Sequence, residues 1–244
     1  MVAISTVRSL ARAAILTRIP RTARALVVAG LCAGVAVACG SDPASSTNPG
    51  TISKVSGDSQ SVVVAAALAS PMVVRVLAEN GDPVSGTVVS WTLASGAAGT
   101  LAASTSTTDA GGQASMELTA GTIASSITIS ASTGSLVGVT FTQTVTAGAA
   151  SALAKFSGDG IAALVATGVQ AVVRSVDAYG NPVPGVTVNW AVGANGGTLS
   201  ATTSTSDAAG LARVTLTLGT TPGVYTVRAT SGTFAPVIFS ITAI

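Results

Sequence analysis

The sequence predicts an all-β chain that folds into two similar β-sandwiches, one after the other. First, a chain of 244 residues has room for two domains of about 100 residues each. Second, the chain is rich in valine and threonine, which favour strands, and contains 27 glycines, which suit turns, whereas only 8% of its residues are charged. Third, the stretch DAYGNPVPGVTVNW at residues 177–190 repeats the pattern of AENGDPVSGTVVSW at residues 78–91.

The repeat extends over most of the chain, because further motifs recur in the same order at nearly constant spacing. The two copies therefore share one layout of strands and differ by small changes in loop length. We expect one domain at residues 53–146 and a second at 151–244, joined by a short segment of small residues. The recurring motifs are KVSGD at 54–58 and KFSGD at 155–159, AGTLAASTSTTDAGGQA at 98–114 and GGTLSATTSTSDAAGLA at 196–212, and ITISAS at 127–132 and YTVRAT at 225–230.

Apolar and polar residues alternate with a period of two inside each copy. In VTVNWAV, Val186, Val188, Trp190 and Val192 share one face, as a half-buried strand requires. Strands of this kind recur roughly every 8 to 15 residues without a helical period, which is typical of a β-sandwich. The other positions predicted to face inward are Ala212, Val214, Leu216, Leu218, Tyr225, Val227 and Ala229 in the second copy, and Val89, Trp91, Leu93, Ala114, Met116, Leu118, Ile127, Ile129 and Ala131 in the first.

Glycine and proline mark the turn that precedes each tryptophan strand. Gly81 and Gly180 stand where the turn requires a positive φ, and Pro83 and Pro182 stand where a fixed φ is useful and a missing N–H is harmless. These residues are interpreted as scaffold, which determines how each copy folds more than what it contacts.

The tryptophans and two aspartates complete the expected scaffold. The indoles of Trp91 and Trp190 are predicted to fill the centre between the two sheets of their copies. Asp109 and Asp207, in TTDAGG and TSDAAG, are predicted to accept hydrogen bonds from nearby backbone N–H groups in a second turn.

This ordered set of motifs resembles the bacterial immunoglobulin-like domains of the intimin and invasin type, group one. The second copy is the better match, since it has Asp177, Gly180, Asn181, Pro182 and Gly185 where the family's turn has them. The first copy departs from the family with Ala78 and Asp82. The resemblance implies two tandem immunoglobulin-like β-sandwiches, used as structural repeats in surface proteins that often form stalks with an adhesive tip.

The N-terminal segment predicts export. Basic residues precede the apolar run ALVVAGLCAGVAVA, which indicates that residues 1–38 are a signal peptide. Cys32 lies within this segment and is expected to be removed when the signal peptide is cleaved. The sequence AVAC, ending at Cys39, resembles the lipobox of bacterial lipoproteins and implies a lipidated Cys39 as the mature N-terminus. The alternative is ordinary cleavage near Ala38, which leaves Cys39 as a plain thiol.

Residues 39–52 are expected to form a flexible tether between the lipidated Cys39 and the first domain, since they lack a hydrophobic period. Ser41 after Gly40 favours an outer-membrane location over retention in the inner membrane. The expected partner is therefore a membrane, through the lipid anchor. Five of the eleven basic residues lie in the first 24 positions, which leaves six basic against nine acidic residues and gives no reason to expect nucleic-acid binding.

The sequence favours a non-catalytic protein without a cofactor or metal. It contains no histidine, which excludes a Ser-His-Asp triad, a Cys-His dyad and a histidine-based metal site, and its acidic residues are scattered singly. Weaker alternatives are Ca²⁺ binding by Asp177 with Asp207, a glycan held by arginines gathered on one sheet face, and sugar stacking on Tyr179. The arginines concerned are Arg174, Arg213 and Arg228.

The expected function is that of a cell-envelope lipoprotein whose domains form a structural or adhesive stalk or spacer at the bacterial surface. The first alternative is a module that binds a surface glycan or protein through loops of the distal domain. The second is an accessory subunit of an envelope hydrolase.

Overall fold

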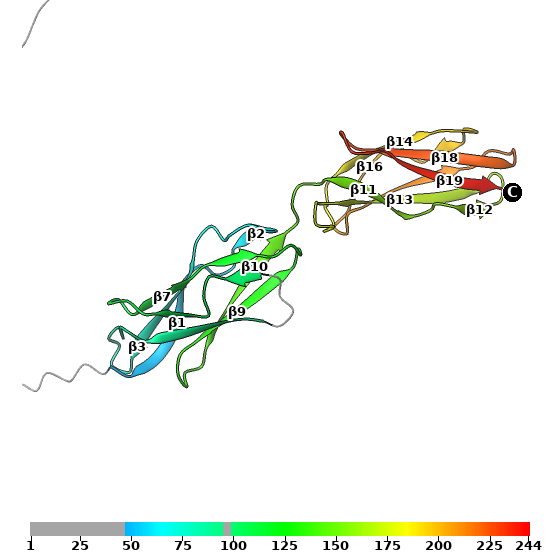
Figure 1. The fold of residues 1–244 in the computed structure, drawn as a ribbon. Coiled ribbons are helices and arrows are strands. Elements are labelled where there is room, and N and C mark those ends of the chain that lie inside the picture. The colour runs from blue at the N-terminus through cyan, green and yellow to red at the C-terminus, as the bar shows by residue number, and fades with distance from the viewer. Residues whose placement is uncertain (1–46, 95–98) are drawn as a thin grey trace, which may run out of the picture. The chain divides into compact units, whose positions relative to one another are not determined.

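The computed structural model describes residues 47–94 and 99–244, and within these ranges the chain forms strands and no helix (Figure 1). Accordingly, this part of the chain has no helix long and apolar enough to cross a membrane. The predicted signal peptide and Cys39 lie outside the described residues.

The first half of the chain forms a sandwich of mainly antiparallel sheets. One sheet has the order β1-β3-β7, the facing sheet has the order β2-β10-β9-β4-β6, and β5 pairs with β8. Within the facing sheet, β2 runs parallel to β10. The strands are β1 (Pro49–Ser56), β2 (Ser61–Val63), β3 (Met72–Ala78), β4 (Val88–Leu93), β5 (Gly99–Leu101), β6 (Thr105–Thr107), β7 (Gln113–Met116), β8 (Leu118–Ala120), β9 (Ser126–Ser132) and β10 (Val139–Thr146).

The second half repeats this arrangement. Its sheets have the orders β11-β13-β17-β15 and β12-β19-β18-β14-β16, and β12 runs parallel to β19. The strands are β11 (Ala152–Ser157), β12 (Ile161–Ala163), β13 (Gly168–Val176), β14 (Thr187–Val192), β15 (Thr198–Leu199), β16 (Thr203–Thr205), β17 (Leu211–Thr217), β18 (Gly223–Thr230) and β19 (Val237–Ala243).

One strand of the second half corresponds to two in the first. Gln170 pairs with Thr215 in the continuous ladder between β13 and β17. The repeat places Pro71 and Glu117 at these two positions of the first half, and there β3 begins after Pro71 while the partner strand divides into β7 and β8 at Glu117. The interruption follows because proline has no N–H to donate to the ladder.

Each sandwich buries a hydrophobic cluster of its own between its sheets. The aromatic centre of the first is Trp91 against Phe141, with ring centroids 5.8 Å apart, and that of the second is Trp190 against Phe239 at 6.3 Å. Both pairs are tilted, a geometry that aromatic rings favour. The clusters therefore form where the period-two pattern places its inward-facing residues.

The first strand begins earlier than the sequence suggests. β1 starts at Pro49, inside the predicted tether of residues 39–52, and pairs Pro49 with Ala78 and Ile52 with Val76. The pairing uses the backbone and a single buried side chain, so no hydrophobic period reveals it. A Cβ on Gly50 would lie 2.7 Å from the backbone nitrogen of Glu79, which explains why glycine stands there.

The predicted inward position of Val192 is wrong. Val188 and Trp190 are buried, whereas Val192 is 41% exposed. It is the last residue of β14 and lines an open hollow with Trp190, Gly197 and Leu199. Alternation along a strand predicts burial only as far as the facing sheet extends.

Candidate functional site

The turn after β13, here called the docking turn (residues 177–181), contains two polar side chains that are almost completely buried. Asp177 is 3% exposed and Asn181 is 7% exposed. The Oδ1 atom of Asp177 accepts hydrogen bonds from the backbone N–H groups of Tyr179 at 2.8 Å and Asn181 at 2.9 Å. These two bonds are internal to the turn and fix its shape.

The other polar atoms of these two side chains bind backbone groups that belong to the first half of the chain or to the connection after it. Asn181 donates through Nδ2 to the carbonyl oxygen of Thr122 at 2.8 Å and accepts through Oδ1 from the N–H of Ala124 at 2.9 Å. Asp177 accepts through Oδ2 from the N–H of Gly148 at 2.9 Å and from Nδ2 of Asn181 at 2.9 Å. Residues 122–124, here called the receiving loop, connect β8 to β9, and the whole contact lies within the single unit Pro43–Ile244.

The hydrogen bonds to Asp177 favour its ionised form. Burial has the largest single effect and raises the pKa of Asp177. The side chain of Asn181 and the backbone N–H groups of Gly148, Asn181 and Tyr179 together outweigh burial and lower the pKa to about 2. The carboxylate is therefore charged at neutral pH and compensated by N–H donors.

The corresponding turn of the first copy has the same backbone without these side-chain contacts. Ala78 N–H donates to Asp82 O at 2.8 Å and Gly81 N–H to Ala78 O at 3.0 Å, and Gly81 has a φ of 88°. In the docking turn, Asp177 N–H donates to Asn181 O at 3.0 Å, and Gly180 has a φ of 84°. The turn thus forms with either residue set. The interpretation of the motif as scaffold alone is incomplete, because Asp177 and Asn181 add a contact outside their own sandwich.

The prolines lie directly after these turns. Pro83 forms an isolated bridge with Leu77, and Pro182 forms one with Val176. The next residue of each copy supplies the N–H that proline lacks, since Val84 donates to Val76 and Val183 donates to Ser175.

The tryptophans are buried and their indole N–H groups are satisfied. Trp91 is 2% exposed and donates through Nε1 to Ser106 Oγ at 2.8 Å, and Trp190 is 3% exposed and donates to Ser204 Oγ at 2.8 Å. Ser106 and Ser204 were not among the residues predicted from the sequence. Their signal is the repeated TST of β6 and β16, which lie beside β4 and β14 in the ladders.

Asp109 and Asp207 each accept two backbone N–H groups within their turns. Asp109 Oδ1 accepts from Gly111 at 2.8 Å and Gln113 at 2.9 Å. Asp207 Oδ1 accepts from Ala209 at 2.9 Å and Leu211 at 3.0 Å, and its Oδ2 pairs with Arg213 at 2.6 Å. The Arg213 contact is the main cause that lowers the pKa of Asp207. Among the described residues, no three metal-binding side chains gather around a common point.

The weaker alternative, in which three arginines gather on one sheet face, does not hold. Arg174 lies on β13 and Arg213 on β17, whereas Arg228 lies on β18 of the facing sheet. The order of strands in the sheets, which cannot be read from the sequence, places these arginines on two different sheets. Tyr179 is 54% exposed at the tip of the docking turn.

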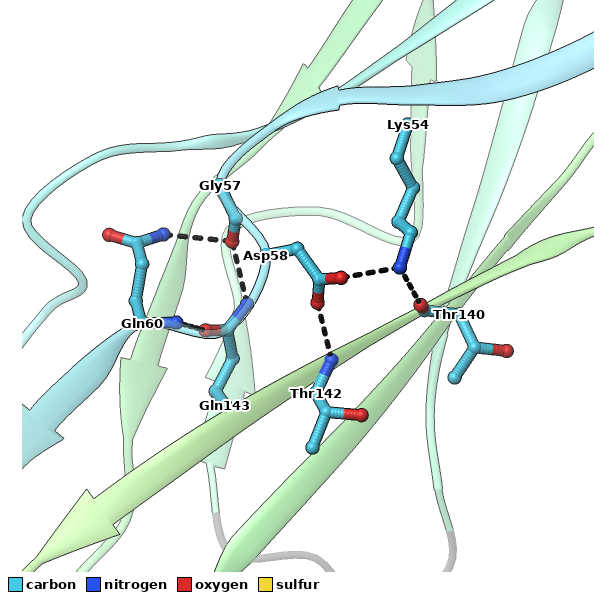
Figure 2. A network of polar contacts seen from close by, with 7 residues as sticks. All are labelled: Lys54, Gly57, Asp58, Gln60, Thr140, Thr142 and Gln143. Atoms are coloured by element: carbon cyan, nitrogen blue, oxygen red, sulfur yellow. Dashed lines mark hydrogen bonds and ion pairs between the residues drawn. The ribbon is translucent and has the colours of Figure 1, made fainter.

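The KVSGD motif forms a strap between β1 and β10, shown in Figure 2. Lys54 donates to the Asp58 carboxylate and to Thr140 O at 3.0 Å, and Asp58 Oδ1 accepts from Thr142 N–H at 2.9 Å. The second copy has the same strap, in which Lys155 donates to Asp159 at 2.6 Å and Asp159 accepts from Ser240 N–H at 2.9 Å. In both copies the lysine contact is the main cause that lowers the pKa of the aspartate.

One segment of the second half is similar to a known protein family. Residues 156–238 match the bacterial Ig-like domain family, group 1. The matched segment contains the docking turn, Trp190 and the Asp207 turn, so the resemblance found in the sequence is confirmed for the second copy. In the first copy, the likeness rests on the repeat and on the common strand order.

The chain is also similar to several solved structures. InvD of Yersinia pseudotuberculosis is 22% identical with a TM-score of 0.53, over 75% of this chain and 54% of InvD, so the chain spans about half of that structure. The Escherichia coli adhesin FdeC is 22% identical over 80% of this chain and 65% of its own, with a TM-score of 0.44. The D0-D1 domain of intimin is 21% identical over 80% of this chain and 98% of its own, with a TM-score of 0.33. No curated protein matches the chain.

Proposed function

We propose that the chain is an exported, lipid-anchored protein of the cell envelope, in which two Ig-like domains at residues 53–146 and 151–244 form a non-catalytic spacer with a structural or adhesive role. The observation that carries the proposal is the contact between the docking turn and the receiving loop. A spacer holds its far end away from its anchor only if the joint between its domains is stiff. Buried hydrogen bonds between successive domains restrict bending, whereas a linker without such contacts does not.

The anchor in this proposal is Cys39, acylated after removal of residues 1–38. Its support is the apolar run that ends in AVAC, followed by Gly40 and Ser41. Two or more acyl chains are sufficient for stable membrane attachment. In this arrangement the residues between Cys39 and the start of β1 at Pro49 separate the first domain from the membrane surface.

The experiment that tests the anchor is fractionation of cells expressing Cys39→Ser, with Cys32→Ser as the matched control. Cys39→Ser is expected to release the protein from membranes and to abolish the acyl mass on its N-terminal peptide. Cys32→Ser changes the same residue type within the leader and is expected to leave both unchanged. A Cys39→Ser protein that stays in membranes, beside a wild type without acyl mass, would show that the anchor is wrong.

A second candidate function is recognition of a surface glycan or protein by the distal loops of the second domain. The open hollow beside Trp190, with the exposed Val192 at its edge, favours it. A glycan array probed with residues 40–244, with and without Val192→Asp, tests this candidate. Binding that the substitution removes would favour a binding module over a plain spacer.

A further inference from the structure

The contact at the docking turn has two complementary halves. One half is a pair of side chains, Asp177 and Asn181, which offers one amide donor and two oxygen acceptors. The other half consists of three backbone groups, Thr122 C=O, Ala124 N–H and Gly148 N–H. Each side-chain donor of the contact meets a backbone acceptor, and each side-chain acceptor meets a backbone donor.

The first copy lacks the side-chain half. Ala78 stands where the second copy has Asp177, so no carboxylate is present to accept an N–H from outside the turn. Asp82 stands where the second copy has Asn181, and an ionised carboxylate cannot donate to a carbonyl oxygen. Asp82 is instead exposed and accepts from Asn80 Nδ2 at 2.8 Å.

The second copy lacks the backbone half. The repeat aligns Thr122, Ile123 and Ala124 with Thr220, Thr221 and Pro222, because Gly121 corresponds to Gly219 and Ile127 to Tyr225. Pro222 has no N–H, so the donor that Ala124 offers to Asn181 is absent from this loop.

We infer that the residues 177–181 are a docking site for the loop of a preceding Ig-like domain, and that this chain encodes the joint only once. The first copy cannot dock onto a domain before it in this way, and the second copy cannot receive a domain after it through the same set of hydrogen bonds, because Pro222 has no N–H. The loops of the second copy at residues 164–167, 193–197 and 219–223 therefore do not offer a following domain the receiving surface that residues 122–124 offer. This inference rests on the proposed spacer function and assigns the residues that form its stiff joint.

The side-chain half can be tested by distance measurements between two spin labels in residues 40–244, which contain no native cysteine. Labels on Val137→Cys and Val224→Cys report on the two domains, since both side chains are exposed. Asn181→Asp places a carboxylate against Thr122 O and is expected to broaden the distance distribution about twofold by releasing the joint. Asp82→Asn makes the reverse change in the first copy and is expected to leave the width unchanged. Unchanged Trp emission shows that both variants remain folded.

The backbone half can be tested in a chain extended by a second copy of residues 147–244 after Ile244. Distances between spin labels on either side of the new joint are expected to be broadly distributed, because Pro222 has no N–H to donate to Asn181 of the added copy. Pro222→Ala restores an N–H and is expected to narrow the distribution. An Asn181→Asp chain as narrow as the wild type, or an extended chain whose new joint is as narrow as the native one, would overturn the inference. Neither result depends on acylation of Cys39, so failure here is distinct from failure of the anchor.

Discussion

The side-chain amide of Asn181 bonds to both the carbonyl oxygen of Thr122 and the N–H of Ala124, which lie on one loop between β8 and β9. An amide is uncharged and has its donor and its acceptor on separate atoms, so that it can bond to a carbonyl oxygen and to an N–H at the same time. The corresponding residue of the first copy is Asp82, which forms the same backbone turn and can only accept. The difference between the copies therefore concerns what the turn contacts and not how it folds.

Loss of the buried indole is expected to destabilise the second domain strongly. Trp190→Ala leaves a cavity against Phe239 and should lower the free energy of unfolding by about 3–5 kcal/mol. Ser204→Ala keeps the indole and removes only its acceptor, so it should lower that free energy by about 1–2 kcal/mol. Urea unfolding followed by circular dichroism measures both. Equal effects of the two substitutions would contradict the packing role of the ring.

Replacement of a buried, unpartnered hydroxyl is expected to stabilise the second domain. Ser175 Oγ is buried without a hydrogen-bond partner, and the corresponding residue of the first copy is Val76, which is fully buried. Ser175→Val should raise the free energy of unfolding by about 1 kcal/mol, because it removes an unsatisfied polar group and adds apolar contact.

The reciprocal substitution is the control for this prediction. Val76→Ser should lower the stability of the first domain by about 1–3 kcal/mol. Calorimetry resolves the sign of each change. A destabilising Ser175→Val would show that the second core has no room for the valine that the first accommodates.

Glycine at residue 210 is expected to be required by space as well as by backbone angle. Gly210 has a φ of 74°, and a Cβ there would lie 2.6 Å from Ser175 O. Gly185 has a φ of 77° with nothing within 4 Å of the added Cβ. Gly185→Ala should cost about 1–2 kcal/mol from the backbone angle alone, and Gly210→Ala about 3 kcal/mol or more because its neighbour must also shift. Thermal unfolding compares them, and equal costs would exclude the steric term.

The joint is expected to weaken in acid. The folded-state pKa of Asp177, about 2, lies below the ordinary value of 3.8, so ionisation favours the folded contact. This contribution is complete above about pH 4 and is lost as the pH falls from about 4 towards 2. Label distances measured across this range should broaden in the wild type, and Asp177→Asn should remove the pH dependence. A joint that opens between pH 7 and 5 would point to a different group.

The sequence by itself determined which residues face inward, where the chain turns and that two copies share one layout. Val188, Trp190, Leu216 and Tyr225 are all buried as the period-two pattern predicts, because in a strand the face of a side chain depends only on its position along the chain. For the same reason the positive φ at Gly81 and Gly180 could be predicted from the turn residues alone.

Only the tertiary structure decided which of these groups meet. Asn181 and Thr122 are 59 residues apart in the chain, and no local period relates them. Strand order places Arg228 on the sheet that faces Arg174 and Arg213, the extent of the facing sheet leaves Val192 exposed, and the ladder brings Ser204 beside Trp190. Local periodicity distinguishes buried from exposed side chains. Which residues contact each other depends on the long-range pairing of strands, and no short stretch of the sequence specifies that pairing.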